Sequence, residues 1–427
     1  MKNSGIEWIG EIPDSWKLIP NKHLFINHSS KVGDKWKNYK LLSLTTTGVK
    51  EKNINSAGGK VPTSYETYQT VTPGDIVFCL FDLDCSAVFS GLSTSSGMIT
   101  SAYDVFAPKA GFLDGRFAEY WFSYVFSNRY YKIYSKNIRY AVTSDAFGGI
   151  LTPVPPLYIQ EKIGMILQSR CNEVDKLVEI QQAQIEKLKE YKQSVITEAV
   201  TKGIDPNVPM KDSGVEWIGQ VPSNYIMKKM GWLADYKKGP FGSSIKISMF
   251  VSKSENTYKV YEQKNAIYKN ATLGSYYISK EKFEELSSNE VLPGDIIVSC
   301  AGTIGECYQM PENMEPGIIN QALMRVRLNG KIISEYFLYL FDAVISKASQ
   351  SASNGSAMKN IPPFDVLKNI RVFIPSIDSQ RKIVDFLNKK CRDIQCLLSL
   401  KQSKIEKLQE YKKSLIYEYV TGKKEVV

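Results

Sequence analysis

The chain has 427 residues, with 54 Lys and Arg against 44 Asp and Glu, a formal net charge of +10 at pH 7. This length predicts two or more domains, and a 43% hydrophobic content predicts a globular interior. No apolar stretch is long enough to span a membrane and the polar start lacks an apolar signal region, so we expect a cytoplasmic protein. Seven Cys without a CxxC pair, and only two His, argue against a metal site.

The opening segment of the chain returns later. SGIEWIGEIPDSW at 4–16 and SGVEWIGQVPSNY at 213–225 agree at 7 of 13 positions, 209 residues apart. The next matches are offset by 220 residues: VTPGDIV at 71–77 with VLPGDII at 291–297, and GMITSA at 97–102 with GIINQA at 317–322. VPPLYIQEKI at 154–163 matches IPSIDSQRKI at 374–383 at the same offset. The repeat indicates two comparable halves.

The middle of each half predicts mixed strands and helices. Short β-rich runs at Asp75–Leu80, Ile99–Phe106, Asp295–Cys300 and Leu323–Leu328 are separated by Gly, Ser and Asn turns. Helical patterns follow at Arg116–Tyr134 and Ser334–Ser346, and we interpret their aromatic residues as core rather than as a base-stacking platform. The middles differ while their flanks stay alike, which indicates two different tasks; ordinary drift of loops after duplication is the alternative.

A long helical segment closes each half, at 158–203 and 378–427. IEKLKEYKQSVITEAVTKG at 185–203 and IEKLQEYKKSLIYEYVTGK at 405–423 agree at 12 of 19 positions. A helix of about 40 residues spans roughly 60 Å, more than a domain of about 150 residues can cover. Its three-four apolar spacing predicts that the two helices pair as a coiled coil, although packing of each on its own domain is the alternative. The pairing residues would be Ile163, Leu167, Val174, Leu177, Leu188, Ile383, Leu387, Ile394, Leu397 and Leu408.

Three turn-rich loops combine cations with hydroxyl and amide side chains. Lys and Arg neutralise phosphates, whereas Asn, Ser and Arg can read base edges, so these loops are candidate DNA-binding segments. Connector loops of the same composition are common, which leaves each loop weak evidence by itself. The candidate residues are Lys136, Arg139, Tyr140 and Ser144; Lys237, Lys238, Ser243, Ser244 and Lys246; and Asn354, Ser356 and Lys359.

We identify no sequence motif typical of an enzyme active site. The sequence contains no GxxxxGK[ST] phosphate loop. Asn360-Ile-Pro-Pro-Phe364 departs from the catalytic tetrapeptide of amino-methyltransferases, because Ile361 separates the Asn from the prolines. A non-catalytic binding protein is the simplest interpretation.

The ordered motifs give the chain its resemblance to a known family. The SGxEWIGxxP openings, PGDI at 73–76 and PGDII at 293–297, KGPFGS at 238–243, GTIGE at 302–306, GIINQA and the two EKLxEYKxSxIxE helices stand in order. With them, the chain resembles the specificity (S) subunit of type I restriction–modification systems over essentially its whole length. The set is highly specific, whereas any one motif is not.

The resemblance implies an α+β fold with two pseudo-symmetric target recognition domains, at 1–157 and 204–377, separated by the two helices paired antiparallel. Each domain would read one half of a bipartite, asymmetric site in double-stranded DNA, while the helices set the spacer and dock two modification subunits. Methylation with S-adenosylmethionine and cleavage with ATP and Mg²⁺ would belong to partner modification and restriction subunits, so the chain itself would need no cofactor. The alternative is a two-headed scaffolding protein that binds other proteins at the ends of a coiled coil.

Overall fold

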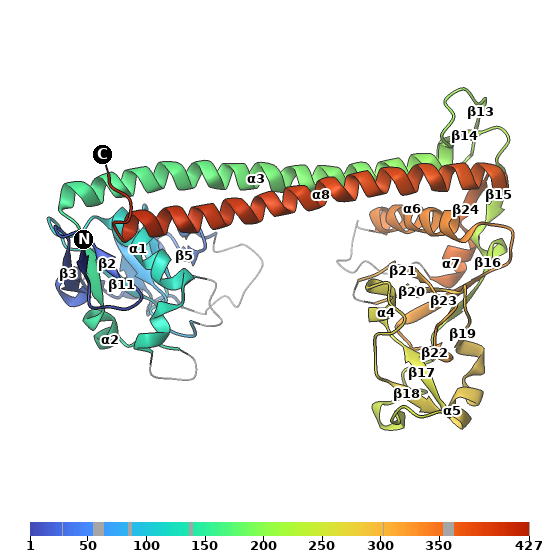
Figure 1. The fold of residues 1–427 in the computed structure, drawn as a ribbon, viewed down its shortest axis with the longest axis horizontal. Coiled ribbons are helices and arrows are strands. Elements are labelled where there is room, and N and C mark those ends of the chain that lie inside the picture. Colours follow the sequence, from blue (N-terminus) through green and yellow to red (C-terminus); the bar gives the residue numbers. More distant parts are fainter. Residues whose placement is uncertain are drawn as a thin grey trace. The chain divides into compact units, whose positions relative to one another are not determined.

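The computed structural model describes residues 1–27, 29–53, 64–83, 88–135, 140–301, 303–352 and 363–426. The chain divides into two compact units: unit 1 comprises residues 1–183 and 401–427, and unit 2 comprises 184–400 (Figure 1).

Unit 1 is built on an antiparallel sheet in the order β4 (Phe25–Ile26), β11 (Asp104–Pro108), β8 (Ile76–Phe78), β9 (Ser90–Leu92). Helix α1 (Gly115–Ser127) buries Phe117, Trp121 and Phe122 in one cluster with Ile76 and Phe78, so these aromatics are core, as the sequence predicts. The remaining elements are the pairs β1 (Lys2–Asn3) with β2 (Glu11–Ile12), β3 (Lys17–Pro20) with β12 (Leu151–Val154), β5 (Leu42–Thr45) with β6 (Gly48–Glu51) and β7 (Gln69–Val71) with β10 (Gly97–Ile99), and helix α2 (Ser144–Gly149).

Unit 2 contains a matching antiparallel sheet in the order β16 (Ala234–Lys238), β23 (Leu323–Leu328), β20 (Ile296–Ser299), β21 (Cys307–Gln309), packed against α6 (Ser334–Ala352). A second sheet has the order β18 (Tyr277–Ser279), β17 (Thr257–Tyr261), β22 (Gly317–Ile319), β19 (Glu290–Val291), with β17 and β22 parallel. The remaining elements are the pairs β13 (Met210–Asp212) with β14 (Gln220–Pro222) and β15 (Ile226–Lys229) with β24 (Arg371–Ile374), and helices α4 (Gln263–Ile267), α5 (Lys280–Glu285) and α7 (Phe364–Asn369).

Short 3₁₀ segments connect several of these elements. They lie at Asn21–His23, Gly33–Asn38, Tyr130–Tyr134, Met230–Trp232, Ile247–Met249 and Ser287–Asn289.

The repeated motifs occupy equivalent structural positions. In each PGD motif the glycine has a left-handed backbone (Gly74 φ 94°, Gly294 φ 83°). The following aspartate is buried, and its Oδ2 accepts the backbone N–H three residues earlier, at 2.7 Å for Asp75 and 2.8 Å for Asp295. Each PGD segment is therefore a tight, internally bonded turn that leads into a central strand of its sheet.

The SGxEWIG openings form turns that precede β2 and β14. Glycines with positive φ bracket each turn, including Gly5 at 73° and Gly214 at 63°. Trp8 is half-buried, and its ring centroid lies 4.3 Å from that of Tyr130. Trp217 is also half-buried and packs against the core of unit 2. Both tryptophans thus serve packing.

A fully buried glutamine fastens each long helix to its own domain. The Gln160 side chain donates to the carbonyls of Pro155 (2.9 Å) and Phe112 (3.0 Å) and accepts the backbone N–H of Asp114 (2.9 Å). Gln380 donates likewise to Pro375 (3.0 Å) and accepts from the backbone of Ile333 (2.9 Å). The start of each long helix is thereby tied to the segment that begins α1 or α6.

Gln160→Leu is expected to destabilise unit 1 by about 2–4 kcal/mol, because it leaves buried backbone groups at the start of α1 without partners. Chemical denaturation followed by tryptophan fluorescence would measure the change. Gln168→Leu, at an exposed position of the same helix, should change stability by no more than about 0.5 kcal/mol. Equal effects of the two substitutions would contradict the fastening role.

The long helices are α3 (Leu157–Lys202) and α8 (Ile377–Val420), and the two compact units divide within them rather than at their ends. Gly164, inside α3, faces the start of α1: a Cβ there would lie 3.0 Å from Arg116 and Asp114 side-chain atoms. The glycine therefore allows close approach without interrupting the helix.

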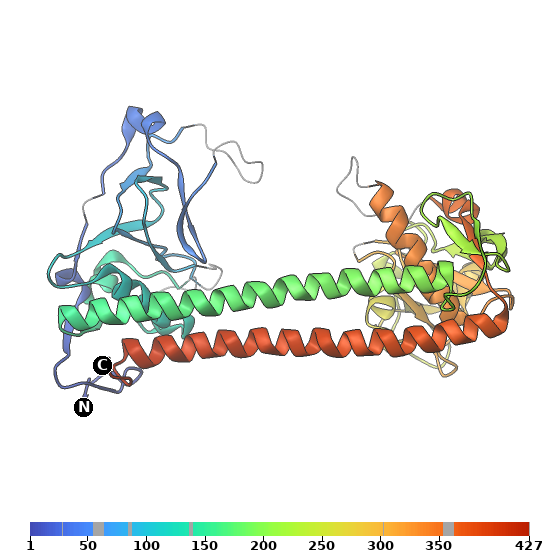
Figure 2. The same ribbon diagram turned by 90° about the horizontal axis from the view of Figure 1, so that it is seen from above.

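Within each unit, the segments of the two helices run side by side and antiparallel (Figure 2). In unit 1, Ile163 and Leu167 of α3 share a buried cluster with Leu415 and Val420 near the end of α8. Unit 2 has the reciprocal cluster, in which Ile383, Val384 and Leu387 meet Ile196, Ala199 and Val200. Both clusters also contain domain residues, so each helix pairs with the other and packs on its domain. The predicted fold class, two mixed domains with antiparallel paired helices, is confirmed.

Two predicted pairing residues are wrong. Leu177 and Leu397 are 43% and 46% exposed, whereas Ile163, Leu167, Val174, Ile383, Leu387 and Ile394 are buried and Leu188 and Leu408 half-buried. After Val174 the less exposed positions continue at 178, 181 and 185, with the 3.6-residue period of a straight α-helix. The heptad assumption of 3.5 residues drifts away from this face and selects 177 instead.

Candidate nucleic-acid interface

The first candidate surface is the end of the unit 2 sheet where β16 and β20 finish and β23 and β21 begin, which we call the unit 2 edge. The loop after Lys238, the turn before Leu323 and the segment after Ser299 meet there, since Lys238 pairs with Met324 and Ser299 with Leu323. Helix α4 adds Gln263, whose amide donates to Ser299 Oγ at 3.3 Å and also to the carbonyl of Ala301.

Cations gather at this edge. Lys237 and Lys238 are the last residues of β16, and Lys246 lies in the loop that follows it. Within the described part of the chain none of the three forms an ion pair with a carboxylate. The carboxylate of Glu306 is already paired with Lys269 at 3.0 Å. Burial raises the pKa of the Cys300 thiol to about 11, with Lys238 opposing the shift, so this neighbouring thiol is uncharged at neutral pH. The edge thus offers positive charge to an anionic partner.

The equivalent end of the unit 1 sheet, the unit 1 edge, has different chemistry. Its exposed residues follow β4 and β8 and precede β11. Phe81 and Tyr103 stack with ring centroids 6.0 Å apart. Burial, then nearby Cys79 and Tyr68, raise the pKa of Tyr103, so the phenol remains a neutral hydrogen-bonding group. Ser29 donates to the Gln69 side chain at 2.8 Å. Among the described residues of this edge, polar and aromatic groups stand out.

A distant segment joins the unit 1 edge through the backbone. The N–H of Val142 donates to the carbonyl of Leu80 at 2.8 Å, which brings Tyr140 close to the end of β8. The ammonium of Lys132 lies 4.2 Å from the centre of the Tyr140 ring, a cation–π contact. The sequence predicted Tyr140 as a DNA-binding residue but not Phe81 or Tyr103. Backbone pairing between distant segments brings these residues to one edge, and no short stretch of sequence indicates that pairing.

Unusual backbone conformations occur at both edges. Among the described residues, the non-glycine residues with left-handed φ are Asp82 (48°), Arg129 (55°), Tyr140 (50°) and Lys269 (52°). Asp82 and Tyr140 lie at the unit 1 edge, and Lys269 binds Glu306 at the unit 2 edge. Arg129 starts the 3₁₀ turn that contacts the unit 1 edge through Tyr131 and the carbonyl of Leu83. Such conformations cost about 1–3 kcal/mol each and concentrate at functional sites.

The structure describes some of the predicted DNA-binding residues and not others. Tyr140 is half-buried at the unit 1 edge and Ser144, exposed, begins α2. At the unit 2 edge, Lys238, Ser243 and Lys246 are exposed and Lys237 and Ser244 half-buried. The other predicted residues lie outside the described residues: Lys136, Arg139, Asn354, Ser356 and Lys359.

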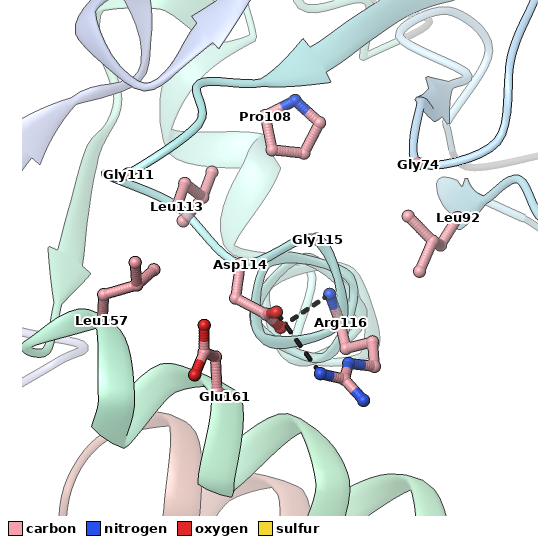
Figure 3. Close-up of a pocket in the computed structure, with 10 residues that line it drawn as sticks. All are labelled: Gly74, Leu92, Pro108, Gly111, Leu113, Asp114, Gly115, Arg116, Leu157 and Glu161. Carbon is pink, nitrogen blue, oxygen red and sulfur yellow. Dashed lines mark hydrogen bonds and ion pairs between the residues drawn. The ribbon is translucent and has the colours of Figure 1, made fainter.

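A hollow of about 480 Å³ lies at the opposite end of the unit 1 sheet, where β11 finishes and α1 begins (Figure 3). Two of its charged groups bind each other: Asp114 Oδ1 accepts the N–H of Arg116 at 3.0 Å, and the two side chains form an ion pair at 3.6 Å. Glu161 of α3 also faces this hollow. It is thus separate from the unit 1 edge.

The described residues contain no group of three or more His, Cys, Asp or Glu side chains arranged to hold a metal ion. No helix among them is long and apolar enough to cross a membrane.

Sequence comparisons connect the chain to one family. The family model described as "Type I restriction modification DNA specificity domain" matches residues 241–407. A Methanocaldococcus jannaschii protein assigned as the MjaX specificity subunit of a type I restriction enzyme is 23% identical over 271 residues, 64% of this chain and 58% of that protein. The MjaVIII specificity subunit of the same organism is 25% identical over 289 residues, 66% of this chain and 64% of that protein. The matched part is thus about three fifths of these curated relatives.

Structure comparisons find the same architecture along the whole chain. A chain from a study of complex assembly and conformational transition of the type I R-M system matches with a TM-score of 0.70 at 14% identity, over 96% of this chain and 98% of that one. The HsdS subunit of Thermoanaerobacter tengcongensis matches with a TM-score of 0.52 at 14% identity, over 99% and 100%. The ordered repeat, the family model over residues 241–407 and this shared fold all make the chain similar to the specificity (S) subunits of type I restriction–modification systems.

Proposed function

We propose that each unit reads one half of a bipartite, asymmetric DNA site, and that the chain itself catalyses no reaction. This proposal rests on one contrast. The buried framework of the two units is repeated, whereas the exposed residues at the unit 1 edge and the unit 2 edge differ. The buried aspartates, glutamines and sheets recur at equivalent positions, whereas the unit 2 edge presents Lys238 and Lys246 and the unit 1 edge presents Ser29, Phe81 and Tyr140. Different chemistry on one frame suits two different base sequences.

We further propose that the paired helices set the number of unread base pairs between the half-sites. Helix α3 has 46 residues and α8 has 44, each without interruption. Buried clusters join them near both of their ends, and Lys412 pairs with Asp175 at 2.7 Å between those ends. A continuous, paired helix keeps a fixed length of about 1.5 Å per residue, which is what a ruler requires.

Docking of two modification subunits is supported by exposed apolar residues that repeat at the 220-residue offset. Two aliphatic side chains of one helix and a tyrosine of the other occur in each unit, all between 43% and 62% exposed. Two copies of one apolar set suit two copies of one partner. The sets are Leu177, Ile180 and Tyr411 in unit 1, and Leu397, Leu400 and Tyr191 in unit 2.

The remaining functions would belong to partners. In this proposal the modification subunits bring S-adenosylmethionine and methylate adenine, and restriction subunits bring ATP and Mg²⁺ and cleave DNA. The chain contributes recognition and assembly.

Exchanging residues 1–157 for those of another specificity subunit is expected to change one half of the methylated motif and leave the other half and the spacer intact, because the unit 2 edge is untouched. Methylome sequencing of cells that carry the chimera with its modification subunit reads both halves at once. The reciprocal exchange of 204–377 serves as the matched control. A change in both halves after a single exchange would rule out one unit per half-site.

A further inference from the structure

The loop after β16 exposes two large apolar side chains to an unusual degree. Phe241 is 85% exposed and Ile247 is 82% exposed, the highest values for large apolar residues in the described part of the chain. Single exposed apolar residues are ordinary, but two on one short loop at a cationic edge are not. Covering either side chain would remove apolar surface from water, so the loop suits a partner that provides an apolar contact.

The backbone fixes the position of Phe241. A Cβ at Gly239 would lie 1.8 Å from the carbonyl oxygen of Asn320, so only glycine fits there, and the N–H of Gly239 donates to Leu323 at 2.9 Å. On the other side, Ile245 is buried among Val260, Ile278 and Ile318. The N–H of Ser244 donates to the carbonyl of Phe241 at 2.8 Å and closes a turn. Phe241 therefore stands at the tip of a turn with both of its ends anchored.

The positive charge beside Phe241 indicates that the partner is double-stranded DNA. Lys238 and Lys246, both exposed, flank Phe241 in the sequence, and Ile247 directly follows Lys246. A duplex provides phosphates for the lysines, and its stacked bases provide an apolar contact to a side chain that enters between them. Phe and Ile are among the residues that proteins use as such wedges.

We propose that Phe241, supported by Ile247, inserts between adjacent base pairs in the half-site read by unit 2, while Lys238 and Lys246 hold the flanking phosphates. The insertion unstacks one step and bends the duplex there, so that half-site would favour an easily unstacked pyrimidine–purine step. The inference rests on the proposed DNA recognition and adds the manner of reading.

The test uses the full-length chain purified with its modification subunits and duplexes carrying the methylated motif. 2-Aminopurine replaces one base at a time across the half-site assigned to unit 2, because its fluorescence rises when it is unstacked. We expect a severalfold rise at one step besides the target adenine. Phe241→Ala should abolish that rise and weaken binding roughly tenfold to hundredfold, whereas Phe241→Leu should keep most of both.

Two controls separate the possible failures. Ile226→Ala removes an exposed apolar residue on β15. It should change neither the 2-aminopurine fluorescence nor the DNA affinity. Unstacking at the target adenine should persist in Phe241→Ala, which shows that the variant still assembles on DNA. If Phe241→Ala keeps the full fluorescence rise and the full DNA affinity, insertion of Phe241 is contradicted. The same holds if the wild-type complex unstacks no base step besides the target adenine. Neither result contradicts the proposed DNA recognition. If the wild-type complex shows no preference for the methylated motif, the proposed recognition itself fails.

Discussion

A chain carrying Leu177→Asp together with Ile180→Asp is expected to hold one modification subunit instead of two. The substitutions place two charges in the exposed apolar set of unit 1, and burying an unpaired carboxylate against a partner costs several kcal/mol. Leu397→Asp with Leu400→Asp should remove the other modification subunit, and the fourfold variant should bind none. Native mass spectrometry of the purified complexes counts the subunits directly.

The matched control adds the same charge elsewhere on α3. Gln168 and Asn172 are exposed, and Gln168→Asp with Asn172→Asp should leave two modification subunits in place. Thermal unfolding of the isolated chains verifies that both double variants remain folded. If the apolar variants retain two modification subunits, docking takes place elsewhere on the chain.

Inserting seven residues into both long helices is expected to lengthen the DNA spacer. The insertion points are between Ala183 and Gln184 in α3 and between Leu400 and Lys401 in α8, where the two compact units divide. Seven helical residues add about 10 Å, which corresponds to about three base pairs at 3.4 Å per pair. The half-sites should stay the same, since neither edge is altered, and methylome sequencing reads the new spacing.

Insertion into one helix alone provides the contrast. It shifts α3 against α8, so the buried clusters of unit 1 and unit 2 can no longer both keep their register. We therefore expect loss of methylation rather than a new spacing. An unchanged spacer after the paired insertion would contradict the ruler.

Local sequence patterns predicted the frame of the fold well. Pro156 and Pro375 end the strands before the long helices, and the aromatic residues of α1 have helical spacing with a buried face, so both features could be found from short segments. The pairing face was harder, because the choice between residues 177 and 178 depends on whether the helix pair follows a period of 3.5 or 3.6. Leu177 therefore looked like a buried seam residue and is exposed.

The candidate interface could be predicted only in part. The lysines around KGPFGS stood out by composition, but the unit 1 edge forms from segments that strand pairing brings together, such as Leu80 and Val142. The exposure of Phe241 was equally hidden, since phenylalanine in a sequence predicts core. The structure shows Phe241 exposed, at the tip of a turn that the close approach of Gly239 to Asn320 anchors on one side.

The composition of the two apolar sets has an evolutionary consequence. Because the helices are antiparallel, the set in unit 1 takes Tyr411 from the second repeat, and the set in unit 2 takes Tyr191 from the first. Under the proposed docking, a mutation in either helix would weaken the binding of either modification subunit, and selection would act on each helix through both. Under the proposed recognition, each edge belongs to one unit alone. New DNA specificities would then evolve in one unit at a time, while the two helices would be held to a common sequence.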